Sequence, residues 1–452
     1  MEIAQQSARP QSTVVPMIII ATLFFVFGFV TWLNGSLIPF LKLVCDLTES
    51  QAMWVTFAFY IAYVVMALPM SWVLNRIGYK NGMVAGLGIM AVGAVVFIPA
   101  ALSTEYGLFL VALFTLGTGL TILQTASNPY IVCIGPRETA AMRISIMGLV
   151  NKGAGVIVPL VFTAVILTGM DAYTPEALAQ LSADEKAAKI TELSHRLVVP
   201  YLYMTIALLA LMAFVKTSSL PEPVLETAVD ESIAAQPEQR TSVMQFPQLV
   251  LGVVALFFYV GVEVIAGDTI GLYGQNLGVS NWGALTSYTM AFMVLGYLVG
   301  VTCIPKYLSQ PRALQGSAVF GILFTLGVMF ASNESHQLAS MLYGWTEPLF
   351  AVLGSSGIPT VPDSIFFLAL LGFANALVWP AVWPLALDGL GRFTATASAL
   401  LIMGIAGGAI LPKVYGFIAT ASGNAQTAYW LMIPCYAFIL YYAFVGYKKR
   451  QW

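Results

Sequence analysis

The chain has 452 residues, of which 59% are hydrophobic and only 9% are charged. Soluble proteins carry roughly 25% charged residues, so this composition excludes a soluble globular protein and indicates a polytopic membrane protein. The formal net charge of −2 is not that of a nucleic-acid-binding chain, and no nucleic-acid partner is expected.

Apolar stretches long enough to cross a bilayer follow one another along the chain. A helical span needs about 20 residues. The sequence predicts twelve such spans, at 14–40, 51–74, 82–102, 107–134, 143–168, 197–217, 247–274, 281–304, 313–331, 363–387, 395–419 and 427–447. The first is too long for a cleaved signal peptide and has no preceding basic cluster, so we interpret it as a span. We expect an all-α polytopic membrane protein with 12 transmembrane helices.

Lys and Arg are distributed unevenly among the loops between these spans. Placing both termini in the cytoplasm puts most of the basic residues on the cytoplasmic side, as in most membrane proteins. We therefore expect a multi-pass protein of the bacterial inner membrane with both termini cytoplasmic, and we expect a monomer. The outside loop 169–196 predicts a short surface helix that begins near Pro175.

A polar segment divides the spans into two sets of six. Residues 218–246 are acidic and contain proline without any membrane-length apolar run, which is typical of a linker. The predicted units are an N-terminal bundle at 1–217, a cytoplasmic linker at 218–246 and a C-terminal bundle at 247–452. Ile146-Met-Gly148 recurs as Ile402-Met-Gly404 at an offset of about 255 residues, so the bundles are interpreted as parallel repeats with a solute site between them.

The fourth span contains an unusual polar run, Gln124-Thr-Ala-Ser-Asn-Pro-Tyr130. Unpaired polar groups in hydrocarbon cost several kcal/mol each, so such groups normally face a bundle interior or a wet cavity. We expect Pro129 to interrupt the helix at this point. The run therefore predicts a solute site near the middle of the membrane.

Several motifs resemble the fucose–galactose–glucose symporter family of the major facilitator superfamily. They are Trp32-Leu-Asn-Gly-Ser-Leu-Ile-Pro39, Gly78-Tyr-Lys-Asn-Gly82, Gln124–Tyr130, Gly135-Pro-Arg-Glu138, Tyr259-Val-Gly-Val-Glu263 and Gly404-Ile-Ala-Gly-Gly-Ala-Ile-Leu-Pro412. Within that family the chain resembles bacterial glucose/galactose and N-acetylglucosamine transporters. The resemblance implies the major facilitator fold and secondary active import of a hexose-type monosaccharide by alternating access, coupled to H⁺ or Na⁺.

The chain departs from the proton-coupled fucose members at two positions. Those members carry an aspartate where this chain has Gly35 and a glutamate where it has Gln124. The resemblance assigns proton coupling and sugar binding to these two acids. Their proton mechanism therefore cannot be transferred unchanged to this chain.

Amide and aromatic side chains are the candidates for binding a monosaccharide. Amides both donate and accept hydrogen bonds, as sugar hydroxyls do, and aromatic rings stack on the apolar faces of a pyranose. The predicted substrate-binding residues are Asn34, Gln124, Asn128, Asn151, Tyr259, Gln275, Asn375, Trp379 and Trp383. Hydrogen bonding and packing between helices remain the alternative interpretation of these side chains.

Charged residues inside spans are the candidates for ion coupling. Glu263, Asp268 and Lys152 have this position. Glu263 is the preferred coupling group, and a fixed Glu263–Lys152 ion pair between the bundles is the alternative. Sodium would take oxygen ligands, for which Gln124, Thr125 and Glu263 are possible. No resident cofactor is expected, only co-transported H⁺ or Na⁺.

The sequence contains no motif of an ATP-driven pump or of an enzyme. No Gly-x-x-x-x-Gly-Lys-Ser/Thr phosphate loop is present, and both histidines, His195 and His336, lie in loops, so an ATP-driven pump and an enzyme are not expected. A carrier of another polar or lipidic solute, or an uncoupled sugar facilitator, remains the alternative.

Overall fold

The computed structural model describes residues 14–133, 140–169, 173, 180–218, 220, 241–304, 306–344, 346, 358–390 and 393–452. Within these residues the chain is helical and contains no strand. The described part holds 12 helices that are long and apolar enough to cross a membrane. The predicted fold class is confirmed.

The first half of the chain contributes a bundle of long helices. Its elements are α1 (Val14–Trp32), α2 (Asn34–Val44), α3 (Glu49–Ala52), α4 (Trp54–Ile77), α5 (Tyr79–Ser103), α6 (Tyr106–Cys133), α7 (Ala140–Ile166), α9 (Ala183–His195) and α10 (Val198–Thr217). Within this bundle α5 packs between α6 and α10, α4 packs on α6, and α1 packs on α7.

The second half forms a second bundle in which α11 is central. Its α-helices are α11 (Pro247–Asp268), α12 (Ile270–Asn276), α13 (Leu285–Cys303), α14 (Gln310–Phe330), α15 (Gln337–Tyr343), α17 (Asp363–Asn375), α18 (Val378–Leu387), α19 (Thr394–Met403), α20 (Gly407–Ser422), α21 (Ala425–Ala428) and α22 (Met432–Phe444). Short 3₁₀ turns are η4 (Val243–Gln245), η5 (Trp282–Ala284), η7 (Gly404–Ala406), η8 (Tyr429–Leu431) and η9 (Gly446–Lys448). Helix α11 packs on α18, α20 and α22.

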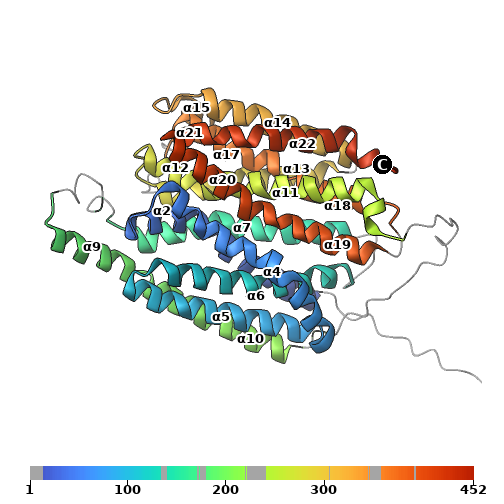
Figure 1. Cartoon of the computed structure of the whole chain (residues 1–452), viewed down its shortest axis with the longest axis horizontal. Coiled ribbons are helices and arrows are strands. Elements are labelled where there is room, and N and C mark those ends of the chain that lie inside the picture. Colours follow the sequence, from blue (N-terminus) through green and yellow to red (C-terminus); the bar gives the residue numbers. More distant parts are fainter. Residues whose placement is uncertain are drawn as a thin grey trace, which may run out of the picture.

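The two bundles meet along two pairs of helices. Helix α7 packs on α13, and α4 packs on α20. Figure 1 shows the blue and green helices of the first half on one side and the yellow to red helices of the second half on the other. At one end, α2 and α3 contact α12 and α20. We call this the closed end, and we call the opposite end, where the chain finishes, the C-terminal end.

Helix interruptions occur at places other than the predicted one. Helix α6 runs unbroken from Tyr106 to Cys133, so the expected interruption at Pro129 is wrong. A proline removes one ladder bond, and in membrane helices neighbouring groups compensate for that loss. The breaks lie instead between α1 and α2 at Leu33, between α11 and α12 at Thr269, and between α17 and α18.

Two expectations fall partly outside the described residues. The linker at 218–246 is described only at 218, 220 and 241–246. Residues 174–179, where the surface helix was expected to begin, are not described, and the described helix α9 begins at Ala183. Ser182 caps α9 by accepting from the Glu185 amide, and Glu185 reaches back to Ser182, so a capping box fixes this start.

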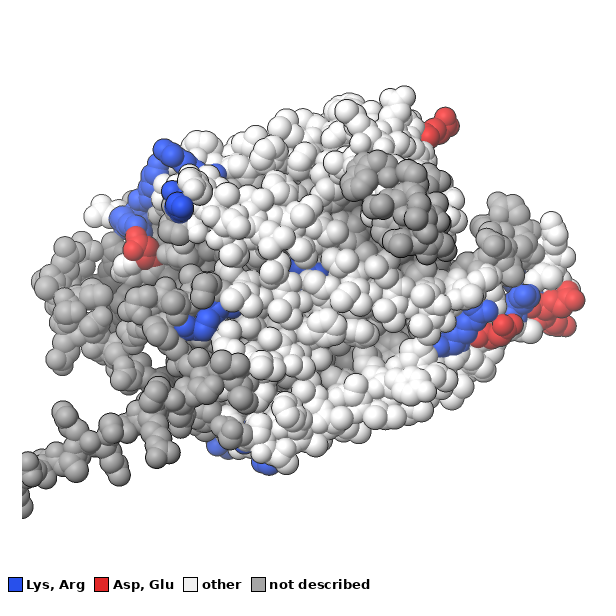
Figure 2. Space-filling model, turned by 180° about the vertical axis from the view of Figure 1, so that it is seen from behind, with Lys and Arg blue, Asp and Glu red and all other residues white. Residues whose placement is uncertain are grey.

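The charged residues are mostly at the two ends of the molecule. Figure 2 shows a broad face between groups of charged side chains at opposite ends, and this face is uncharged except for a small blue patch near its middle. Large apolar side chains such as Phe417 and Leu323 remain exposed on helices, as expected where a helix faces lipid. The molecule thus has the charge distribution of a protein that spans a bilayer.

Candidate functional site

An ion pair joins the two bundles through the middle of the structure. Lys152 on α7 donates from Nζ to Oε1 of Glu263 on α11 over 2.8 Å, and each side chain is only 10% exposed. Breaking such a buried pair by removing one partner costs about 3–5 kcal/mol, because the other charge is left uncompensated. The sequence left open whether Glu263 couples an ion or pairs with Lys152, and in this conformation it is paired.

An indole and an amide from the first bundle lie beside this ion pair. The Lys152 ammonium lies 4.3 Å from the centre of the Trp32 ring, in cation–π geometry. Trp32 donates from Nε1 to Oδ1 of Asn151 over 3.4 Å, and Asn151 donates to the Phe24 carbonyl over 3.3 Å. Trp32 thereby holds a fixed orientation against the charges, with its ring packed on α13 at Met290.

Aromatic side chains of the second bundle surround Glu263. The Glu263 carboxylate acts electrostatically on the hydroxyls of Tyr259, Tyr297 and Tyr436. The Tyr259 ring lies 6.3 Å from Trp379, which in turn lies 5.5 Å from Trp383. The predicted residues Tyr259, Trp379 and Trp383 therefore form a row of neighbouring aromatic rings, and Tyr259 is the one next to Glu263.

Two predicted amides lie at helix breaks with unused hydrogen-bonding capacity. Asn34 begins α2 and Asn375 ends α17, and both are 1% exposed. Asn375 accepts from the Tyr436 hydroxyl over 2.9 Å. The amide nitrogens of both residues are buried without a hydrogen-bond partner. Because an unpartnered buried donor is costly, these nitrogens are available to a ligand or to another conformation.

The polar run of α6 approaches α4. Gln124 is half-buried and donates from Nε2 to the Tyr63 hydroxyl over 2.9 Å. Tyr63 stacks on Tyr60 at 6.2 Å, and Tyr60 is within electrostatic range of Glu263 and Asp268. The Thr125 hydroxyl donates to the Thr121 carbonyl of its own helix.

Not every predicted residue lies in the central region. The side chain of Asn128 is outside the described residues. Gln275 lies at the closed end, where its Nε2 donates to the Pro39 carbonyl over 3.4 Å. In the part of the chain that the structure describes, no group of three His, Cys, Asp or Glu side chains could hold a metal ion.

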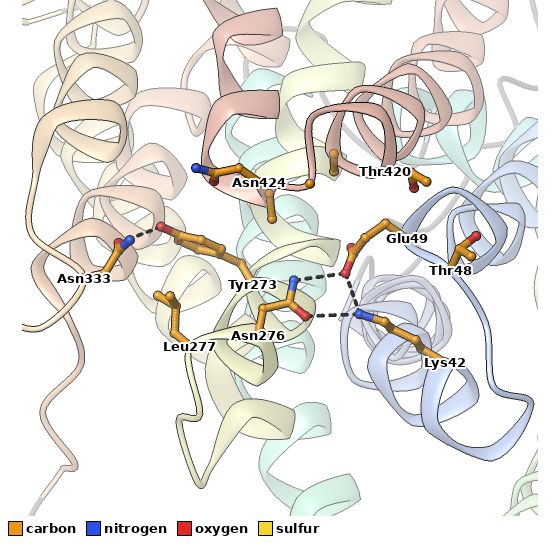
Figure 3. A pocket seen from close by; sticks show the side chains of 12 residues that line it. Lys42, Thr48, Glu49, Tyr273, Asn276, Leu277, Asn333, Thr420 and Asn424 are labelled. Carbon is orange, nitrogen blue, oxygen red and sulfur yellow. Dashed lines mark hydrogen bonds and ion pairs between the residues drawn. The ribbon is translucent and has the colours of Figure 1, made fainter. Parts of the chain in front are cut away.

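The closed end contains a cavity of about 550 Å³ that is lined by residues of both bundles. Figure 3 shows Lys42, Glu49 and Asn276 pointing toward one another at its wall. Lys42 donates to Glu49 over 2.5 Å and to Asn276 over 3.1 Å, and Asn276 donates to Glu49 over 3.0 Å. This three-residue network ties α2 and α3 of the first bundle to α12 of the second.

Further bonds across the closed end come from backbone groups. The Ser50 amide donates to Thr420 over 3.0 Å, and Lys413 donates to the Ser50 carbonyl over 2.5 Å. Ser36 donates to the Gly283 carbonyl over 2.5 Å. Lys413 thus forms a contact between the two bundles.

Sequence reasoning missed Tyr60, Tyr63, Asn276 and Ser50. The two tyrosines recur in the second span at a spacing of three residues, which places them on one helix face, and this signal could have been used. Ser50 lies in the short helix α3 and Asn276 ends α12, and neither position has a distinguishing sequence pattern. Their importance depends on a long-range contact that the sequence does not reveal.

The whole chain is similar to known transport proteins. The model of the Major Facilitator Superfamily matches residues 20–412. A glucose/galactose transporter of Brucella abortus is 33% identical over 94% of this chain and 93% of its own length. An L-fucose-proton symporter of Haemophilus influenzae is 27% identical over 96% of this chain and 97% of its own.

Solved structures share the same architecture. The crystal structure of the major facilitator transporter FucP in the outward conformation superposes with a TM-score of 0.69. It is 23% identical and covers 96% of this chain and 99% of its own. A D-xylose-proton symporter gives a TM-score of 0.63 at 14% identity, over 96% of this chain and 97% of its own. At these identities the likeness shows the fold.

Proposed function

Because the chain belongs to the Major Facilitator Superfamily and, within it, to the fucose–galactose–glucose symporter family, we propose that it is a secondary active transporter that imports a hexose-type monosaccharide. The cargo is a sugar of the glucose and galactose class, as named for the relative from Brucella abortus. N-acetylglucosamine is the second candidate cargo, suggested only by the motif resemblance.

The buried Lys152–Glu263 pair carries this proposal. It lies between the two bundles, and an indole and an amide from Trp32 and Asn151 adjoin it. Charged groups buried in a membrane protein are costly and usually mark a transport path. The pair therefore supports a polar solute site at the interface of the repeats, where transporters of this plan bind their cargo.

The candidate binding residues have the chemistry that a pyranose requires. Trp32 and Tyr259 offer flat apolar faces. Asn34 and Asn375 each have an unpartnered amide nitrogen that a sugar hydroxyl can accept from. Gln124 presents a half-buried amide from α6. A lipidic cargo would leave these amides without partners, so the sugar is favoured over a lipid.

Alternating access follows from the way the bundles meet. Bonds at the closed end connect α2 and α3 with α12 and α20. We place the closed end outside the cell and both termini in the cytoplasm, from the distribution of Lys and Arg. The cargo enters when this outer end opens and leaves after it closes, as the bundles rock around the central site.

Transport into proteoliposomes tests the proposal. Purified protein should exchange labelled glucose or galactose across the membrane when the same sugar is present on both sides. Liposomes without protein provide the background, and labelled fucose and N-acetylglucosamine define the cargo. If none of the four sugars is exchanged, the proposed function is wrong. If the protein exchanges sugar but neither a proton nor a sodium gradient drives sugar accumulation, it is an uncoupled facilitator.

A further inference from the structure

Asp268 has no hydrogen-bond partner in the part of the chain that the structure describes. Its residue is 0% exposed, and neither Oδ1 nor Oδ2 takes part in a hydrogen bond. An ionised carboxylate in such surroundings costs several kcal/mol even after the protein relaxes. A neutral carboxylic acid loses much less on leaving water, so it is the form compatible with this conformation.

The local backbone adds a second reason against a negative charge. Asp268 is the last residue of α11, and Thr269 follows it at the break before α12. The C-terminus of a helix carries partial negative charge from its unpaired carbonyl groups. A carboxylate there is repelled by its own helix, whereas a protonated acid is not.

The groups that act electrostatically on this carboxyl do not neutralise it. They are Glu263 on the same helix, Lys152 on α7 and the titratable hydroxyl of Tyr60 on α4. Lys152 already pairs with Glu263 at 2.8 Å. The nearby cation is therefore engaged, and Glu263 adds a like charge. On α13 the neighbouring Thr286 is neutral and donates to the Gly267 carbonyl over 2.8 Å.

The position of Asp268 links its charge to the conformation of the transporter. Gly267 packs against the Trp32 ring, and a Cβ on Gly271 would lie 2.8 Å from the Gly35 carbonyl oxygen. Asp268 thus lies where α11 and α12 press against the first bundle. In the transport cycle proposed above, opening the closed end would separate these surfaces and bring the carboxyl to the outer water.

We propose that Asp268 is the proton-coupling residue of this transporter, because closure of its outer end requires this carboxyl to be protonated. The inference rests on the proposed sugar transport.

With the outer end open, one carboxylate oxygen takes a proton from outer water and an O–H bond forms. After the sugar is released inside, that bond breaks and the proton passes to inner water. One proton enters with each sugar, and each ligand favours binding of the other because both stabilise the closed outer end.

Asp268→Asn tests this step because asparagine is close in size to the protonated acid and cannot titrate. In proteoliposomes the variant should still exchange labelled galactose at equal pH on both sides. An acidic exterior should no longer drive accumulation above the equilibrium level. Asp268→Glu should keep acid-driven accumulation with a displaced pH profile. Asp388→Asn is the matched control, since Asp388 is exposed and pairs with Arg450 at the C-terminal end, and it should behave as the unmodified protein.

Two results would overturn the assignment. One is acid-driven accumulation in Asp268→Asn equal to that of the unmodified protein. The other is accumulation in the unmodified protein driven by a sodium gradient and not by a proton gradient. In both cases sugar exchange would persist, so the proposed function would stand. Loss of exchange in the unmodified protein would instead contradict the proposed function itself.

Discussion

Lys152 and Glu263 allow the energetics of the central site to be measured residue by residue. Lys152→Met or Glu263→Gln leaves the remaining charge buried and unpaired. We expect each to lower the free energy of unfolding by about 3–5 kcal/mol. The double variant should recover most of this loss, because no isolated charge remains. Thermal unfolding of the purified protein in detergent measures the cycle.

The exposed pair between Asp388 and Arg450 is the control for that cycle. Its side chains are 64% and 47% exposed, so its removal should cost at most about 1 kcal/mol. If Lys152→Met were no more destabilising than Arg450→Met, the central pair would not stabilise contact between the bundles.

Gln124 can be assigned to cargo or to packing by comparing two substitutions. Gln124→Ala removes the amide, whereas Tyr63→Phe removes only the hydroxyl to which that amide donates. If the amide binds sugar, Gln124→Ala should weaken sugar affinity about tenfold, equivalent to one hydrogen bond of roughly 1.4 kcal/mol. Tyr63→Phe should have a smaller effect. Equal losses in equilibrium binding would assign Gln124 to helix packing.

At the scale of the elements, close approach of α20 to α11 depends on a residue without a side chain. A Cβ on Gly407 would overlap the Phe257 carbonyl oxygen of α11. Gly407→Ala should therefore push the helices apart and cost about 1–3 kcal/mol of unfolding free energy, as other overpacking changes do. The melting temperature in detergent should fall accordingly.

Gly316 provides the contrast on α14. A Cβ there meets no atom within 4 Å, so Gly316→Ala should be neutral or gain up to about 1 kcal/mol from helix propensity. Similar melting temperatures for the two variants would mean that the contact between α20 and α11 adapts to a methyl group.

The spans were predictable from the sequence because the apolar runs are set by the thickness of the bilayer. The helix breaks were not. Pro129 lies in an unbroken α6, while Leu33 and Thr269 interrupt their spans without proline. Whether a membrane helix breaks depends on which neighbouring groups satisfy its backbone, and these neighbours come from elsewhere in the chain.

The candidate site, like the helices, was only partly predictable from the sequence. Composition and helix position were sufficient to select Lys152 and Glu263, because charge within a span is rare. The contact of Gln124 with Tyr63, and the location of Gln275 at the closed end, depend on how helices pack. Residue types therefore predict the chemistry of the site, while tertiary structure decides which side chains meet.

For the molecule as a whole, the structure is one conformation of a cycle in which the bundles must separate at the closed end. The network of Lys42, Glu49 and Asn276 closes that end through hydrogen bonds and one ion pair. Partly exposed ion pairs contribute at most about 1 kcal/mol each, so this contact can form and break during transport. Under the proposed mechanism, the deeper contact at Asp268 then makes the closure depend on the proton.

A covalent link across the closed end should therefore stop the cycle. Ser50 and Thr420 belong to different bundles and are joined by a hydrogen bond of 3.0 Å. In a background in which the four native cysteines are replaced, Ser50→Cys with Thr420→Cys should react with a short thiol crosslinker and lose sugar exchange. A cleavable crosslinker should allow exchange to return on reduction, and each single cysteine variant should be unaffected. Full exchange by the crosslinked protein would show that the closed end does not need to open, and alternating access through it would be wrong.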